Sequence, residues 1–255
     1  MTDPNVSFFA PLPDDGKLKF EESFDLSDTK HMEQLCLPAV KDLQLYLNSQ
    51  KEWEHNFGLA NQGGPIIGKM FGVLLVQNHE KNLGYLAAFS GKLSNKNTFS
   101  RFVPPVYDTL QEGGFLNTGM LALGEMSAEI TRLREQKPVG SDNQLTELIK
   151  ERKAYSAALQ EQLFESYHFL NQYGEEKSLI ALFKDIGYRK PPAGAGECAA
   201  PKLLQYAFKN ELKPLALTEF WWGLSPKSQT WKHKNFYRPC KEKCEPILKH
   251  MLKGF

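Results

Sequence analysis

The chain has 255 residues, of which 41% are hydrophobic, and its formal net charge is +1. This is enough apolar material to bury the core of one large domain or of two modest ones. No run of eighteen apolar residues occurs, which excludes a membrane-spanning helix, and the N-terminus lacks the features of a signal peptide. We therefore expect a cytoplasmic protein without a membrane partner. In that reducing compartment, clustered cysteines more often bind metals or catalyse reactions than form disulfides.

The charges are distributed unevenly along the chain. The first sixty residues are acidic, with Asp14, Asp15, Glu21, Glu22, Asp25 and Asp28. The last thirty are basic, with Lys227, Lys232, Lys234, Arg238, Lys241, Lys243, Lys249 and Lys253. This asymmetry indicates an anionic partner near the C-terminus, and a solvated lysine-rich face is the alternative.

The predicted elements begin with an extended segment over residues 1–27, which is rich in proline and aspartate. A helix follows to about Asn48, and either Ser27 or Asp28 can cap it. After a loop at 60–68, residues 69–78 read as a buried strand and residues 83–93 as its hairpin partner. The two prolines of "FVPPVYD" keep residues 102–108 extended.

A helical pattern runs over residues 119–182. Its apolar residues keep near-helical spacing with charged residues between them, and "PVGSDN" at 138–143 divides it in two. We expect a coiled-coil-like helical insertion, either one long exposed helix or a helical hairpin. Something must cover its apolar stripe, and a second copy of the chain in a homodimer would do so.

The C-terminal part returns to alternating elements. Residues 190–196 form a loop, 198–210 a helix and 213–223 an apolar strand, which a basic, aromatic loop follows. Pro239 suits the first turn of a final helix that ends near Leu252. The order helix, hairpin, helix, strand, helix predicts an α/β layer fold, with its core in residues 28–118 and 183–255.

Three cysteines are the main candidate site. Cys240 and Cys244 are four residues apart, which places both thiols on one face of a helix. Cys198 opens the preceding helix, and the positive ends of the two helix dipoles favour thiolates. Three thiolates and a water would make an open zinc site. The alternative is that the three are small core residues, as we expect for Cys36.

The order of these cysteines resembles the zinc-dependent deaminase fold. In that family one ligand opens the helix after a β-hairpin, and a Pro-Cys pair of ligands opens the next helix. Here "GECAAP" and "RPCKEKC" stand in those places. Two features depart from the family: Ala200 replaces its proton-shuttling glutamate, and three residues rather than two separate the paired cysteines. Glu197 or Glu219 would have to replace that glutamate. The resemblance implies a three-layer, deaminase-like arrangement.

A second candidate site is the aromatic and basic stretch around the last predicted strand. Aromatic rings among positive charges suit stacking on unpaired bases and contacts with phosphates. Strand alternation allows only one of Trp221 and Trp222 to face the core, and the alternative is that the other covers a helix. Lys202 is poorly matched to the dipole of its helix and is a candidate anion contact. The candidate RNA-binding residues are Lys202, Trp221, Trp222, Lys227, Trp231, Lys232, Lys234, Tyr237 and Arg238.

Seven phrases resemble the N-terminal half of the long bacterial RluA-type pseudouridine synthases. They are "GKMFGVLLV", "GYLAAFSGKL", "FVPPVYD", "LFESYHFLNQYGE", "PPAGAGECAAPKLLQYAF", "LKPLALTEFWWGLSPKS" and "FYRPCKEKCEPILKHML". The resemblance runs from about residue 30 to the C-terminus and is most specific over residues 191–252.

That family isomerises uridine in structured RNA, with a catalytic aspartate in a His-Arg-Leu-Asp motif of a separate C-terminal domain. No such motif occurs in these residues, so the resemblance implies no catalytic residue here. It implies an accessory domain for RNA modification, which binds ribosomal or transfer RNA and acts with a pseudouridine synthase domain in trans. A zinc-binding deaminase-like domain and an interaction module built on residues 119–182 are the alternatives.

Overall fold

The computed structural model describes residues 8–12, 28–61, 63–136 and 141–254. The chain divides into two compact units, one made of Met1–Val106 with His168–Phe255 and the other of Tyr107–Tyr167. The predicted extended segment 1–27 lies outside the described residues except for residues 8–12, in which Ala10–Pro11 forms β1. Among the described residues, no helix combines the length and the apolar character needed to cross a membrane.

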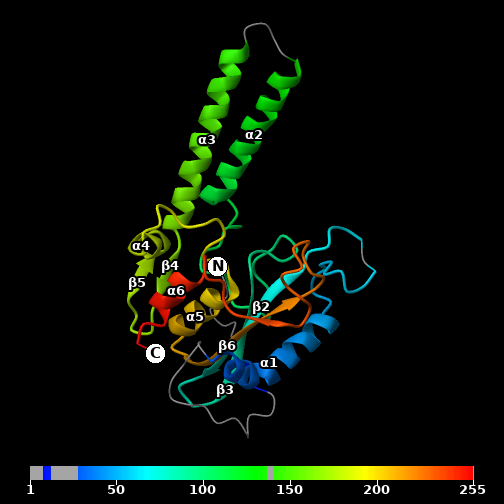
Figure 1. The fold of residues 1–255 in the computed structure, drawn as a ribbon, viewed down its shortest axis with the longest axis vertical. Helices are drawn as coiled ribbons and strands as arrows, with labels where there is room; N and C mark the ends of the chain where they lie inside the picture. Colours follow the sequence, from blue (N-terminus) through cyan, green and yellow to red (C-terminus); the bar gives the residue numbers. More distant parts are fainter. Residues whose placement is uncertain (1–7, 13–27, 62, 137–140, 255) are drawn as a thin grey trace. The chain divides into compact units, whose positions relative to one another are not determined.

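The first unit is built on an antiparallel sheet with the strand order β1-β3-β2-β6-β7 (Figure 1). β2 (Lys69–Gln77) and β3 (Leu83–Phe89) form the predicted hairpin, in register from Phe71 opposite Phe89 to Gln77 opposite Leu83. β6 (Lys213–Trp222) pairs with the other side of β2, and β7 (Phe236–Tyr237) pairs with β6. The mixed α/β class predicted from the sequence is confirmed.

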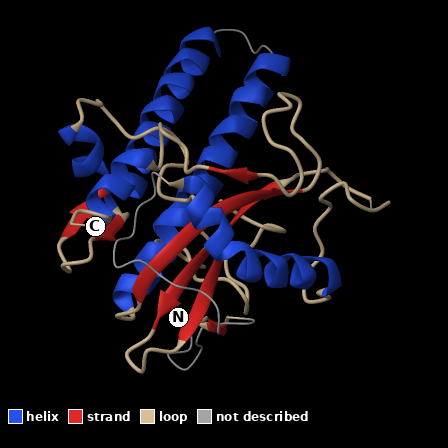
Figure 2. Cartoon of the chain, turned by 60° about the horizontal axis from the view of Figure 1, so that its bottom comes forward, coloured by secondary structure: helices blue, strands red, loops and turns tan. Residues whose placement is uncertain are grey.

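Helices cover both faces of this sheet, which explains why its central strands are buried along most of their length rather than on alternate residues (Figure 2). α1 (Thr29–Ser49) packs on β2 and β6, and α5 (Ala199–Lys209) packs on β2, β3 and β6. The predicted cap of α1 is present, because the Asp28 carboxylate accepts a hydrogen bond from the backbone N–H of His31 at 3.1 Å. Beneath α1, Phe71 stacks on Phe220 at 6.0 Å in an aromatic core.

Helix α5 approaches the sheet closely because a glycine lies beneath it. A Cβ atom added at Gly72 on β2 would lie 3.0 Å from the Cβ of Ala199 and 3.1 Å from Cδ1 of Leu203. The first turn of α5 therefore rests directly on the backbone of β2.

A small two-stranded sheet follows the helical unit in the sequence. β4 (His168–Leu170) and β5 (Glu176–Ser178) pair in antiparallel register, and α4 (Leu179–Asp185) follows, with Ser178 as its N-cap. The helical pattern expected over 119–182 is thus wrong for residues 166–178, whereas its last residues belong to α4. The turn between the strands explains the error, since Asn171 supplies its hydrogen bonds and Gly174 adopts a φ of +78°.

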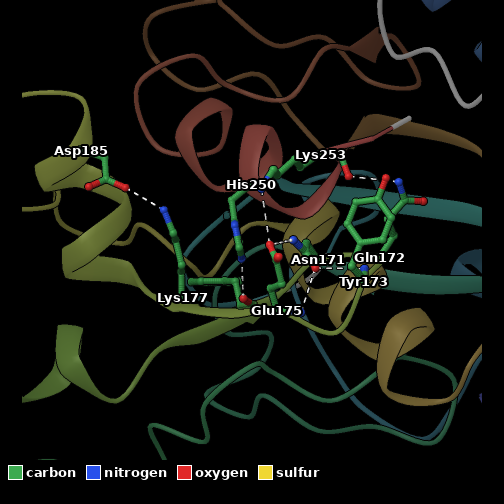
Figure 3. Close-up of polar contacts among 9 residues, drawn as sticks. Asn171, Gln172, Tyr173, Glu175, Lys177, Asp185, His250 and Lys253 are labelled. Atoms are coloured by element: carbon green, nitrogen blue, oxygen red, sulfur yellow. Dashed lines mark hydrogen bonds and ion pairs between the residues drawn. The ribbon is translucent and has the colours of Figure 1, made fainter.

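The turn between β4 and β5 holds the last helix, α6 (Glu245–Met251), as Figure 3 shows. Nε2 of His250 lies 2.9 Å from the carbonyl oxygen of Phe169, and the side chain of Gln172 donates to the carbonyl of Lys253 at 3.0 Å. The ammonium of Lys253 lies 3.6 Å from the carboxylate of Glu175. These contacts fix the helix that follows the cysteine pair.

The second unit contains α2 (Phe115–Gln136) and α3 (Ser141–Glu165), which pack side by side. Gly119 allows the contact, because a Cβ added there would lie 2.6 Å from Cδ1 of Leu159. Nε of Arg152 donates to the hydroxyl of Ser127 at 2.7 Å. The predicted helix breaker covers residues 138–143, of which 138–140 lie outside the described residues.

Candidate metal centre

The thiols of Cys198, Cys240 and Cys244 lie together, with their sulfur atoms all within 4.8 Å of one another. Cys198 is the N-cap of α5, and Cys244 is the N-cap of α6. Cys240 lies in the turn before α6, and its sulfur is 3.3 Å from that of Cys244. This cluster could hold a metal ion. Cys36 lies buried in α1, outside the cluster, as expected for a core residue.

The last helix, α6, begins later in the chain than the sequence predicts. The final helix begins at Glu245 rather than at Pro239, and Pro246 is the proline of its first turn. A tight turn takes the place of the expected helical turn, because the carbonyl of Cys240 accepts hydrogen bonds from the N–H groups of Cys244 at 3.1 Å and Glu245 at 3.2 Å. The two thiols still meet, because the hydrogen bond that closes this turn joins Cys240 to Cys244, the same two residues that a helical turn would have brought together.

The three thiols are electrostatically unequal. Hydrogen bonds from Cys198 and Cys244 lower the pKa of Cys240 to about 2, so Cys240 carries the thiolate. The hydrogen bond to Cys240 raises the pKa of Cys198, and hydrogen bonds to Cys198 and Cys240 raise that of Cys244. Cys240 is also the exposed member of the cluster, whereas Cys244 is buried. The arrangement thus favours the thiolate at the exposed Cys240, and the other two thiols would each release a proton on binding a metal.

A buried carboxyl group lies beside the cluster. Glu219, on β6, is 4% exposed and accepts a hydrogen bond from the backbone N–H of Ala200 at 3.0 Å. Burial raises its pKa to about 7, and the negative charge of Cys240 adds to the shift. Glu219 thereby satisfies an N–H of the first turn of α5, which Cys198 leaves without a side-chain cap.

A buried lysine lies one turn into α5. Lys202 is 3% exposed, and its ammonium donates to the carbonyl oxygens of Phe89 at 2.9 Å and Gly91 at 3.2 Å. Burial lowers its pKa to about 8, while the charges of Glu197 and Cys198 act in the opposite direction. Its predicted role as an exposed anion contact is therefore wrong, because the ammonium points into the fold.

Trp221 and Trp222 are both buried, at 6% and 1% exposure. As strand alternation predicts, only Trp222 belongs to the core cluster beneath α1, and Trp221 is buried on the other face of the strand. Both faces of the end of β6 are covered, since Trp221 stacks on Trp231 at 4.9 Å and Trp222 packs against His233 at 4.5 Å. Neither ring is available to stack on a base in this conformation.

The remaining candidates for RNA contact lie at the surface. Trp231 is 37% exposed on the outer side of the Trp221 ring. Lys227, Lys232, Lys234 and Arg238 are exposed, and Tyr237 is half-buried. Lys234 also lies 5.8 Å from the centre of the Trp222 ring. The exposed set therefore consists of one indole and four positive charges.

Sequence reasoning missed the end of β3 as a neighbour of the centre. The segment from Phe89 to Gly91 accepts both hydrogen bonds of Lys202, and the N–H of Gly91 donates to the carbonyl of Glu197 at 2.9 Å. These hydrogen bonds use only backbone groups of the segment, so they leave no signal in its residue types, and the Lys202 ammonium also lies 5.1 Å from the centre of the Phe89 ring. The burial of Lys202 did have a signal, since it shares a strongly apolar helix with Leu203, Leu204 and Ala207.

No family model matches the chain, and neither the curated proteins nor the solved structures contain a match. A likeness of fold would in any case leave function to be argued from the site. The geometry described above therefore carries the functional argument.

Proposed function

We propose that this chain is a zinc-binding α/β domain with a deaminase-like arrangement, in which Cys198, Cys240 and Cys244 are the ligands. The supporting observation is the convergence of three sulfur atoms from two distant parts of the chain. Zn–S bonds of about 2.3 Å place tetrahedral sulfur ligands roughly 3.8 Å apart. The three sulfur atoms lie within 4.8 Å of one another, with those of Cys240 and Cys244 3.3 Å apart. Cysteine thiolates in a cluster without histidine or carboxylate ligands favour zinc over magnesium or calcium.

The order of elements around the cysteines supports the deaminase-like part of the proposal. The hairpin β2–β3 precedes α5, which carries the first ligand at its N-cap, and β6 leads on to the ligand pair before α6. This is the order that the resemblance implies. The helical unit at Tyr107–Tyr167 is then an insertion between the hairpin and the first ligand helix.

We further propose that Glu219 exchanges protons with groups bound at the metal centre. The zinc would then serve a hydrolytic reaction rather than a structural role. Its carboxyl group hydrogen-bonds to the backbone of Ala200, the residue at the position where the deaminase family has its glutamate. A pKa of about 7 suits a group that accepts and returns a proton near neutral pH. A zinc ion with three protein ligands and one open position makes a bound water acidic.

Metal analysis of the purified chain tests the zinc proposal. We expect about one zinc ion per chain, which the Cys240→Ser variant loses. The matched control is Cys36→Ala, because Cys36 is a buried cysteine outside the cluster. A wild-type protein that binds no zinc, or a Cys240→Ser variant that keeps it, would contradict the proposal.

Cobalt substitution separates a hydrolytic centre from a structural one. We expect Co²⁺ bound to the three thiolates to show visible absorption bands that shift when azide occupies an open fourth position. Glu219→Gln should keep the metal and the bands. Bands that ignore azide would mean a closed coordination shell, and hence a structural zinc site only.

A second candidate function is RNA binding in the context of pseudouridine formation. The exposed Trp231 among Lys227, Lys232 and Lys234 supports it. Replacing these three lysines with alanine should weaken binding to single-stranded RNA and reduce its salt dependence. The control replaces three exposed lysines elsewhere, Lys150, Lys153 and Lys209. Unchanged RNA mobility with micromolar wild-type protein at low salt would remove this candidate.

A further inference from the structure

Two of the clustered thiols are close enough to react with each other. The sulfur atoms of Cys240 and Cys244 lie 3.3 Å apart. A disulfide bond joins sulfur atoms at about 2.05 Å, so a movement of about 1.2 Å would bring this pair to bonding distance. Cys198 belongs to the same cluster but comes from α5, on another part of the chain.

The turn that connects the two residues can accommodate such a bond. The carbonyl of Cys240 accepts hydrogen bonds from the N–H groups of Cys244 and Glu245, so the chain makes one helix-like turn here. Residues four apart in such a turn have Cα atoms roughly 6 Å apart. This lies within the range of about 4.4–6.8 Å that disulfides span, so the cross-link does not require the turn to unfold.

The two thiols differ in exposure in the way that a stepwise oxidation requires. Cys240 is exposed, whereas Cys244 is 1% exposed. The side chains of Lys241 and Glu242 are exposed as well, so the Cys240 end of the turn can move without disturbing a packed core. The Cys244 end is fixed, because the turn between β4 and β5 holds α6 (Figure 3). An oxidant in solution therefore reaches Cys240 first, with Cys244 directly behind it.

We propose that Cys240 and Cys244 are a redox-sensitive modification site, at which a peroxide oxidises the two thiols to a disulfide and so releases the bound metal ion. The release of the ion rests on the proposed zinc site, whereas the formation of the disulfide does not. The disulfide removes two of the three proposed ligands, and Cys198 alone cannot hold zinc.

The reaction has two steps. The sulfur of Cys240 attacks one oxygen of hydrogen peroxide, the O–O bond breaks, and a sulfenic acid and a water form. The sulfur of Cys244 then attacks that of Cys240, the S–S bond forms, and the S–O bond breaks to release a second water. The two thiols give up two electrons and two protons, which the peroxide takes up. In the zinc-loaded chain the two protons come from the solvent, because the ligands are thiolates.

Peptide mapping after peroxide treatment tests the proposal on the metal-free chain. Trypsin cleaves after Lys241 and Lys243, so only a disulfide would join the peptide that contains Cys240 to the one that contains Cys244. We expect the folded chain to lose two of its four thiols, with Cys36 and Cys198 still open to alkylation after unfolding. A link from Cys198 to Cys240, a disulfide between two chains, or a sulfinic acid at Cys240 beside a free Cys244 would overturn the inference.

Two serine variants provide a matched comparison. Cys198→Ser removes a cysteine of the cluster but keeps the pair, and it should form the disulfide as the wild type does. Cys244→Ser should form none and should leave a sulfenic acid at Cys240, which dimedone traps as a stable adduct. The opposite pattern, with the disulfide lost in Cys198→Ser and kept in Cys244→Ser, would contradict the assigned pair.

Zinc release separates this inference from the proposed function. In the zinc-loaded chain, we expect peroxide to release zinc to a chromophoric chelator in step with the loss of the two thiols, and dithiothreitol with added zinc to restore both. A chain that forms the disulfide but never binds zinc removes the proposed zinc site and leaves the reactive pair. A chain that binds zinc and keeps both its ion and its four thiols in peroxide leaves the zinc site and removes this inference.

Discussion

The buried Glu219 makes the stability of the protein depend on pH. Its carboxyl group is buried in the sheet, so the fold favours the neutral form and raises the pKa from 4.5 to about 7. Between these values the unfolded chain has released the proton while the folded chain still holds it. The contribution of Glu219 to stability is therefore largest below about pH 4.5 and falls as the pH rises to about 7.

Glu219→Gln should remove this pH dependence. Glutamine stays neutral at every pH. We therefore expect the unfolding free energy of the variant to rise relative to that of the wild type by roughly 3 kcal/mol as the pH increases from about 4.5 to about 8. Urea unfolding of both metal-free proteins across this range measures the difference. Glu242→Gln, at an exposed position, is the control. Stability curves of Glu219→Gln and wild type that run parallel would contradict the prediction.

Asn171 stabilises the turn between β4 and β5, which contacts the C-terminal helix and the residues that follow it. Its buried side chain accepts hydrogen bonds from the N–H groups of Tyr173 at 3.0 Å and Glu175 at 2.9 Å, and it donates to the Glu175 carboxylate at 2.8 Å (Figure 3). We expect Asn171→Ala to lose about 2 kcal/mol of unfolding free energy, because two backbone donors lose their acceptor. Urea denaturation checks this. Asn210→Ala, which removes an exposed hydrogen bond, should change stability by less than about 0.5 kcal/mol.

Helix α5 packs closely on the sheet because Gly72 lies beneath it. Gly72 leaves room for Ala199 in the first turn of the helix and for Leu203 in the second. We expect Gly72→Val to cost about 1–3 kcal/mol and to weaken zinc binding, because the added methyl groups push the first turn, and Cys198 with it, away from the sheet. Thermal unfolding and chelator competition measure the two effects, and Gly72→Ala should show smaller losses.

The matched control for Gly72 lies in the second unit. A Cβ added at Gly124 in α2 meets no atom within 4 Å, so Gly124→Ala should stabilise the protein by up to about 1 kcal/mol. A Gly72→Val variant as stable as the wild type, with unchanged zinc affinity, would show that α5 shifts without cost.

The elements differ in how well local patterns predicted them. The hairpin β2–β3 and the helices α1 and α5 follow from apolar runs, turn residues and caps, all of which lie within the segments themselves. The short strands β4 and β5 were missed because three residues give no periodicity. The start of α6 was misplaced because either Pro239 or Pro246 can occupy a first turn, and only tertiary contacts choose between them.

For the whole chain, the mixed α/β class was predictable from element order, whereas the interior of the site was not. The meeting of Cys198 with Cys240 and Cys244 was predicted from an assumed layout of helices and strands. The acceptors of the buried Lys202, at Phe89 and Gly91, are distant from it in the sequence, and no local pattern reports them. Backbone groups such as those of Phe89 and Gly91 leave no trace in the residue types at all.

The division into two units predicts that the helical one is dispensable for the metal site. The rings of Tyr107 and Tyr167 lie 5.8 Å apart, so the ends of that unit are close together. We expect a variant in which a short glycine-serine linker replaces residues 107–167 to fold and to bind zinc with the wild-type stoichiometry. Circular dichroism and metal analysis test this. A variant that is unfolded or free of zinc would show that the first unit needs the second.

A metal held by Cys198 and Cys240 would act as a cross-link across about 40 residues, a segment that includes the whole of β6. Binding only to the folded chain, it would add about 2.7 kcal/mol of stability when free zinc is a hundred times its dissociation constant. The resistance of the protein to proteolysis would then follow the zinc supply of the cell. Zinc starvation would remove this cross-link and shorten the lifetime of the protein, even if no reaction takes place at the metal centre.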